Sequence, residues 1–213
     1  GSIISMYTAF CEADPEAMKL IYTLGGNRLQ VMTPKSKKLS PENVIPDKEK
    51  PGYQHVEHTF EPVYDENSEI LILGTFPSVK SRENNFYYGH PQNRFWKLIA
   101  GLTKEPVPET IEEKKALLLK HHIAIWDVVQ SCDIIGSSDS SIKNVVPTDL
   151  GQIISNSQIE RVYCNGAASG NYYKKYQQKV LGIEAVVLPS TSPANAAYSL
   201  DRLIGIWSGT INI

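Results

Sequence analysis

Downstream of about residue 60, short apolar runs alternate with longer segments of mixed polarity. The apolar runs predict strands at 69–74, 123–129, 161–165 and 184–189. The segments between and after them predict helices at 93–102, 109–121, 149–156, 167–180 and 193–208. Strands that are apolar throughout and separated by helices are typical of a parallel sheet covered on both faces. We therefore expect an α/β fold, a three-layer α/β/α sandwich with a central, mostly parallel four-stranded sheet.

A proline-rich and charged segment divides the chain unequally. Residues 33–51 read TPKSKKLSPENVIPDKEKP, a composition typical of a linker or exposed loop. Upstream, the sequence predicts a short helix that follows Asp14 and stops at Gly25, then a strand at 28–31. This part is too small for a core of its own. We predict an N-terminal extension and linker over 1–57 and one domain over 58–213.

Composition narrows the class of protein. With 41% apolar and 21% charged residues, the chain resembles soluble globular proteins rather than disordered or membrane proteins. No signal peptide is visible, so we expect an intracellular protein without a membrane partner. Cys11, Cys132 and Cys164 are too few and too widely spaced for a disulfide framework or a zinc knuckle. The formal net charge of -2 means that binding to nucleic acid would need a local basic patch.

Polar or turn-forming residues lie within the end of each predicted strand or directly after it. In open α/β sheets, ligands bind at the carboxyl ends of the strands, so these tails are expected to converge on one site. The tails are GTFPS at 74–78, Asp127, Asn165 with Gly166, and LPSTSPA at 188–194. The first continues into a segment dense in aromatic and amide side chains, which suits a flat heterocyclic ligand. A loop anchored in the core by its aromatic residues is the alternative.

Four motifs occur in a fixed order along the chain: GTFPS, FYYGHPQNRFW, CNGAA and LPSTSPANA. They resemble the uracil-DNA glycosylase superfamily, and in detail its hypoxanthine-DNA glycosylase branch. The second motif is also similar to the HPxNRFWK stretch of mismatch-specific uracil glycosylases. The resemblance covers roughly residues 58–208. It implies a monofunctional DNA glycosylase of base-excision repair, acting without a cofactor or metal as a monomer in the cytoplasm or nucleoid, or in a nucleus.

The resemblance also implies the reaction. Such an enzyme flips a deaminated base out of DNA, hydrolyses its N-glycosidic bond and leaves an abasic site. Hypoxanthine is the expected first substrate and uracil the second.

The resemblance assigns roles to individual residues. Asn93 is the catalytic asparagine by its place in the motif, although an asparagine there also suits a helix N-cap. Tyr88 would stack on the flipped base, with Phe76 closing the pocket. Asn165 would read the base edge through its amide, although a turn with Gly166 also explains it.

Further residues complete the expected site. Thr75 and His90 are expected to contact the base, although a structural role explains His90 equally well. Hydroxyl and backbone groups of the last loop, with two basic residues, are expected to bind the DNA backbone, and the predicted helix from Pro193 would add its N-terminus. This set is Ser190, Thr191, Ser192, Ala194, Arg94 and Lys143.

Two positions depart from the superfamily pattern. Phe76 stands where many members carry an aspartate or asparagine that activates water, and Leu188 stands where the best-known branch has a histidine. Asp127 and Asp139 are the carboxylates nearest the strand ends and could orient water, although each also suits a turn or cap. His55 and His58 have the spacing of a metal pair, but no further ligands follow, so we assign no metal.

Two other functions remain open at the level of sequence. A non-catalytic module that binds damaged DNA or nucleobases could keep the same fold while lacking the usual carboxylate. A nucleotide-dependent α/β enzyme is disfavoured, because no G-x-G-x-x-G or G-x-x-x-x-G-K-[ST] motif follows any strand.

Overall fold

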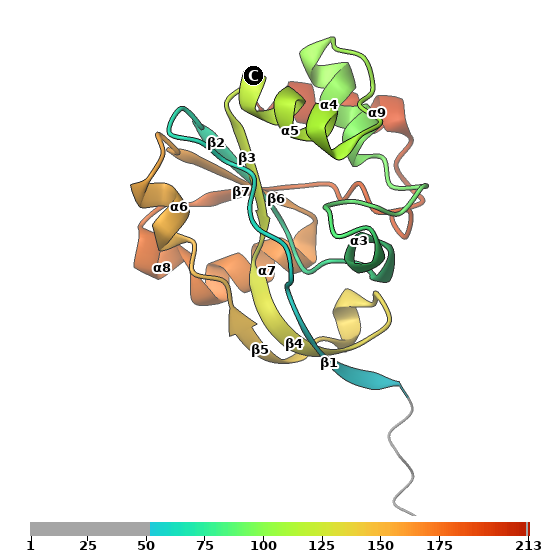
Figure 1. Cartoon of the computed structure of the whole chain (residues 1–213), viewed down its shortest axis with the longest axis vertical. Coiled ribbons are helices and arrows are strands. Elements are labelled where there is room, and N and C mark those ends of the chain that lie inside the picture. The colour runs from blue at the N-terminus through green and yellow to red at the C-terminus, as the bar shows by residue number, and fades with distance from the viewer. Residues whose placement is uncertain (1–51, 212) are drawn as a thin grey trace, which may run out of the picture. The chain divides into compact units, whose positions relative to one another are not determined.

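The computed structural model describes residues 52–211 and 213 of the chain (Figure 1). The elements predicted upstream of residue 33 lie outside these residues. Four strands form a parallel sheet in the order β3-β2-β6-β7. Their bounds are β2 (Ile70–Gly74), β3 (Ile123–Asp127), β6 (Arg161–Asn165) and β7 (Ala185–Leu188). The predicted four-stranded parallel sheet is confirmed.

Helices cover both faces of this sheet, as the three-layer prediction requires (Figure 1). One face carries α4 (Phe95–Thr103), α5 (Ile111–Lys120) and α9 (Leu200–Ser208). The other face carries α6 (Gly151–Ser155), α7 (Ala167–Tyr176) and α8 (Gln178–Leu181). Within the described ranges, no helix is both long enough and apolar enough to cross a membrane.

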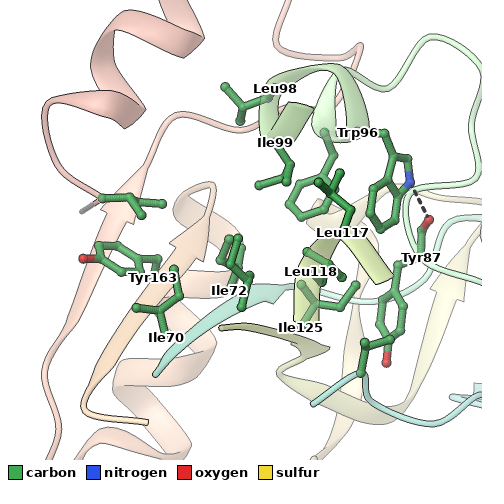
Figure 2. Packing of buried hydrophobic residues seen from close by; sticks show 14 of the residues in the cluster. Ile70, Ile72, Tyr87, Trp96, Leu98, Ile99, Leu117, Leu118, Ile125 and Tyr163 are labelled. Atoms are coloured by element: carbon green, nitrogen blue, oxygen red, sulfur yellow. Dashed lines mark hydrogen bonds between the residues drawn. The ribbon is translucent and has the colours of Figure 1, made fainter. Parts of the chain in front are cut away.

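The alternation of side chains along β2 explains why both faces need cover. Ile70 and Ile72 point into the cluster beneath α4, α5 and α9, part of which is drawn in Figure 2. Leu71 and Leu73 point into the opposite cluster, beneath α6 and α7. All five residues of the strand are buried, so it lies inside two cores at once.

A second, antiparallel sheet was not predicted. It has the order β1-β4-β5, formed by β1 (Tyr53–Glu57), β4 (Val129–Ile135) and β5 (Lys143–Pro147). The predicted strand at 123–129 comprises the whole of β3 and the first residue of β4. The chain leaves the parallel sheet at the end of β3 and enters the antiparallel sheet with β4. The domain boundary between residues 57 and 58 stays a prediction, and β1, which precedes it, pairs with β4.

Two predicted helices need correction. The helix expected at 167–180 is divided at Gln177 into α7 and α8. The closing helix begins at Leu200, capped by Ser199, rather than at Pro193. Residues 189–199 instead form a loop, and several of its carbonyl groups accept hydrogen bonds from the Arg94 side chain. Because helical hydrogen bonding uses the same carbonyls, these contacts favour the loop.

The remaining elements are short. Helix α3 (Val79–Glu83) follows β2, and its N-cap Ser78 accepts a hydrogen bond from the Ser81 backbone N–H. A 3₁₀ turn, η2 (Asp139–Ser141), joins β4 to β5. Both lie on the side of the parallel sheet where its strands end, beside the pocket described next.

Candidate functional site

The carboxyl ends of the parallel strands surround a pocket of about 520 Å³. Gly74, Asp127 and Asn165, the last residues of β2, β3 and β6, line it. The loop after β7 contributes residues 190–192 and 194–195. The predicted convergence of the strand tails is therefore confirmed. The volume falls within the range of about 300–1,000 Å³ that is usual for small-molecule sites.

Asn93 lies in the pocket wall, just before helix α4, and hydrogen bonds fix its amide. Its Oδ1 accepts from the Phe95 backbone N–H at 3.0 Å and from the Thr191 hydroxyl at 2.9 Å. A backbone N–H can only donate, so this contact sets which end of the amide points toward the helix. Within the described part of the chain, the Asn93 Nδ2 group has no protein acceptor and is available to a ligand. The N-cap residue of α4 is Arg94, so the N-cap interpretation of Asn93 is wrong by one position, although Asn93 does accept from the first N–H of the helix. The catalytic role of Asn93 stays a prediction.

Thr191 connects Asn93 to Asn165 across the pocket. Its buried hydroxyl accepts from Asn165 Nδ2 at 2.9 Å while donating to Asn93. The Thr191 backbone N–H donates to Asn165 Oδ1, also at 2.9 Å. Thr191 thus engages both ends of the Asn165 amide, which keeps one N–H and one lone pair for other partners. The predicted base-reading role of Asn165 stays a prediction.

Tyr88 has an unusual backbone conformation for a bulky residue, with φ at +52°. Such strain persists only where the surroundings hold it, and it concentrates at functional sites. One face of its ring stacks on Phe95, with ring centroids 3.7 Å apart and planes inclined by 19°. Its hydroxyl is buried at the pocket without a hydrogen-bond partner. Burial first, and then the charge of Asp127, raise the pKa of this hydroxyl, and the nearby Asn165 amide opposes this shift.

The other residues expected to contact the flipped base divide into two groups, those that line the pocket and one that does not. Thr75 and Phe76 line the pocket and are both buried. The Arg82 guanidinium carbon lies 5.9 Å from the centre of the Phe76 ring. His90 does not line the pocket, and its Nδ1 accepts from the Gln92 backbone N–H.

The residues expected to bind the DNA backbone also divide into those that line the pocket and those that do not. Ser190, Thr191, Ser192 and Ala194 line the pocket. The Arg94 side chain instead donates to the carbonyl groups of the 189–199 loop, which leaves little of its hydrogen-bonding capacity for a phosphate. Lys143 lies on β5, with its ammonium 4.7 Å from the centre of the Tyr53 ring.

The sequence did not reveal the partner of Asp127. Asp127 Oδ2 lies 3.0 Å from His58 Nε2, and both side chains are almost fully buried. His58 follows β1, in the second sheet, so the prediction of a single sheet could not bring it to the end of β3. The two histidines considered as a metal pair contact different carboxylates, since His55 lies 2.8 Å from Asp133.

The serine-rich turn at 137–140 also lines the pocket, and of its residues the sequence had pointed only to Asp139. It includes Asp139, an exposed residue whose carboxyl faces other pocket groups. The protein atoms around the carboxyl group of Asp139 reduce its hydration, which raises its pKa. The charge of Asp127 adds to this shift, and a hydrogen bond with Thr75 opposes it. The two carboxylates considered for orienting water therefore share one pocket.

Comparison with known proteins identifies the family. The model of the uracil DNA glycosylase superfamily matches residues 61–207. A hypoxanthine DNA glycosylase of Methanosarcina acetivorans is 38% identical, over 69% of this chain and 93% of that protein. A hypoxanthine DNA glycosylase of Methanosarcina barkeri is 34% identical, over 68% of this chain and 92% of that protein.

A solved structure is similar as well. The solution NMR structure of a candidate uracil DNA glycosylase from Methanosarcina acetivorans has 36% sequence identity and a TM-score of 0.60. The similarity covers 71% of this chain and 93% of that one. Sequence and fold thus agree, and the chain belongs to the uracil DNA glycosylase superfamily.

Proposed function

We propose that this protein is a monofunctional DNA glycosylase that excises hypoxanthine first and uracil second, leaving an abasic site. The observation that carries the proposal is the Asn93 amide, held at the pocket wall with its Nδ2 group available to a ligand. The names of the two Methanosarcina relatives support hypoxanthine as the base.

The pocket suits a base that has left the double helix. A glycosidic bond inside a duplex is out of reach, so the nucleotide must rotate into the pocket at a cost of a few kcal/mol in lost stacking and pairing. Phe76 and the ring of Tyr88 supply apolar surface in the pocket that offsets part of this cost. Ser190, Ser192 and Ala194 hold the flanking DNA backbone.

Hydrolysis breaks the bond between C1′ of the sugar and N9 of hypoxanthine, or N1 of uracil. The electron pair of that bond leaves with the base, the sugar passes through a state with oxocarbenium character, and water adds to C1′. The proton that the water loses balances the proton that the base takes up. Asn93 Nδ2 orients the water or donates to the developing charge, and donors placed in advance contribute most in such reactions. Phe76, just after β2, has no group that could act as a general base toward the water.

The proposed partner is DNA that contains deaminated bases, and the protein is expected to act on it as a monomer, without metal or cofactor. Its working location is then the compartment that holds the DNA, the nucleoid or a nucleus.

Single-turnover cleavage of labelled duplexes tests the function. Each duplex carries inosine, uracil, xanthine or thymine opposite each base, and alkali reveals the abasic sites. We expect product from inosine, with the rate reduced about 10²–10³-fold in Asn93→Ala, the range for loss of one placed donor. Asn156→Ala, at the end of α6 and outside the pocket, serves as the control. Binding to every duplex with no abasic product would replace the enzyme by a non-catalytic reader of damaged DNA.

A further inference from the structure

The pocket holds an aspartate that the proposed hydrolysis does not use. Asp127 ends β3 with its side chain only 6% exposed. Its Oδ2 is hydrogen bonded to His58 Nε2, and the His58 side chain is 1% exposed. Oδ1 receives no hydrogen bond from the described residues. Asp127 lines the pocket, and the pair therefore keeps one free acceptor atom at this edge of it.

A hydroxyl without a partner lies beside this acceptor. A Cβ built on Gly74 would lie 2.1 Å from Asp127 Oδ1 and 3.4 Å from the Tyr88 hydroxyl oxygen. Both oxygens therefore lie against the same glycine, and its missing side chain makes room for the carboxylate. The Tyr88 hydroxyl is buried without a partner at hydrogen-bonding geometry, although the Asn165 amide lies close enough to lower its pKa slightly against the effect of burial. A buried polar group without a partner costs free energy, and a ligand that satisfies it recovers that cost.

The two groups have fixed and opposite hydrogen-bonding roles. Because its pKa is raised by burial and by the nearby charge of Asp127, the Tyr88 hydroxyl keeps its proton and can donate. A carboxylate accepts and does not donate. The pocket thus presents one donor next to one acceptor. The Asn165 amide is less selective, because an amide offers both roles and Thr191 already engages each end.

We propose, resting on the glycosylase function above, that Asp127 and Tyr88 read the lactam edge of the flipped base. Asp127 Oδ1 accepts from N1–H of hypoxanthine, and the Tyr88 hydroxyl donates to O6. His58 is a positioning residue that holds the carboxylate in place. The N3–H and O4 groups of uracil present the same pattern. Adenine presents the reverse, an amino donor and a ring acceptor, and would leave both protein groups unpaired.

This arrangement differs from stacking of the base on Tyr88. Edge-on contact uses the hydroxyl, whereas stacking uses a ring face, and Phe95 already covers one of the two faces. Tyr88→Phe separates the two arrangements, because it keeps the ring and removes only the donor.

The test uses the full-length protein and duplexes carrying either inosine or deoxynebularine, whose purine base lacks both O6 and N1–H. The measured quantity is the ratio of single-turnover excision rates, inosine over deoxynebularine. The ratio cancels a general loss of activity, which a merely structural role would cause. We expect it to fall at least about tenfold in both Asp127→Asn and Tyr88→Phe. Tyr88→Phe removes the donor, and Asp127→Asn places an amide N–H where the acceptor stood, because the amide oxygen takes over the contact with the His58 Nε2–H group.

Asp133→Asn is the matched control, because Asp133 also contacts a histidine but does not line the pocket. It should keep the wild-type ratio. His58→Ala should lower the ratio, and His58→Gln, which retains an N–H donor, should restore part of it.

A wild-type ratio in either folded variant, Asp127→Asn or Tyr88→Phe, overturns the proposal. Thermal melts establish folding, and if Asp127→Asn does not fold, the ratio in Tyr88→Phe decides. Absence of inosine excision by the wild type is a different failure, since it rejects the glycosylase function itself.

Discussion

Two histidines near the start of the described chain each contact an aspartate, but in contrasting surroundings. His55 and Asp133 are joined across β1 and β4, with side chains 60% and 29% exposed. His58 and Asp127 are 1% and 6% exposed. If one side chain of the exposed pair is removed, water can hydrogen bond to the other, whereas the buried pair has little access to water that could do the same. The same chemistry is therefore incidental on the surface and costly to disturb beside the pocket.

The largest expected effect comes from breaking the buried pair. His58→Ala leaves a buried carboxylate without its partner, and we expect a loss of about 3–5 kcal/mol in the free energy of unfolding. Chemical denaturation measures this loss. His55→Ala should change that free energy by no more than the experimental error. Equal losses in the two variants would contradict the contrast between the pairs.

The approach of Asp127 to Gly74 can be disturbed without touching either member of the buried pair. Gly74→Ala places a Cβ 2.1 Å from Asp127 Oδ1, so the carboxylate must move. Displacement of a binding group by about 1 Å can cost about 10²-fold in rate, and we expect a loss of that order in inosine excision. Excision at the wild-type rate would show that the position of this carboxylate does not matter.

Gly205→Ala is the matched control for a glycine with free space around it. A Cβ at Gly205 meets nothing within 4 Å, and the residue lies inside α9. We expect unchanged excision and a gain of about 0.5–1 kcal/mol in the free energy of unfolding, since alanine favours a helix interior. Thermal and chemical unfolding measure the gain, and a loss of stability would show that a side chain at this position is not accommodated freely.

The smallest effect concerns pH and the surface pair. Hydrogen bonds from Asn144 and His55 lower the pKa of Asp133. A lowered pKa stabilises the fold above the carboxyl's unfolded value of about 3.9, and the gain is lost as pH falls through the folded value. The stability difference between wild type and Asp133→Asn should therefore shrink on acidification. Unfolding midpoints measured from neutral to acid pH test this, and a constant difference would refute it.

The sequence predicted the parallel sheet well because its strands are apolar throughout. It did not predict the antiparallel sheet, because β1 and β5 are short and mostly exposed and so lack that pattern. Nor did it show where β3 ends, since the run IAIWDVV continues without a glycine or proline into β4. The extent of this run depends on pairing with distant strands, which a local pattern does not contain.

The candidate site was predictable to a similar degree. The strand ends and the motifs correctly indicated the pocket position of Asn93, Asn165 and the loop after β7. The contact between Asn93 and Thr191 joins residues 98 positions apart, and the His58–Asp127 contact joins residues 69 apart. Such contacts require the folded arrangement of the sheets, so no local pattern could indicate them.

The hydrogen bonds of Arg94 have a consequence for the energetics of association. They tie down the irregular loop at 189–199 in the free protein. The conformational entropy of ordering that loop is therefore lost when the chain folds, rather than when a ligand arrives. Because this loop is already ordered, less of the free energy of new contacts is spent on ordering it when a ligand binds, although the segment contains no helix or strand.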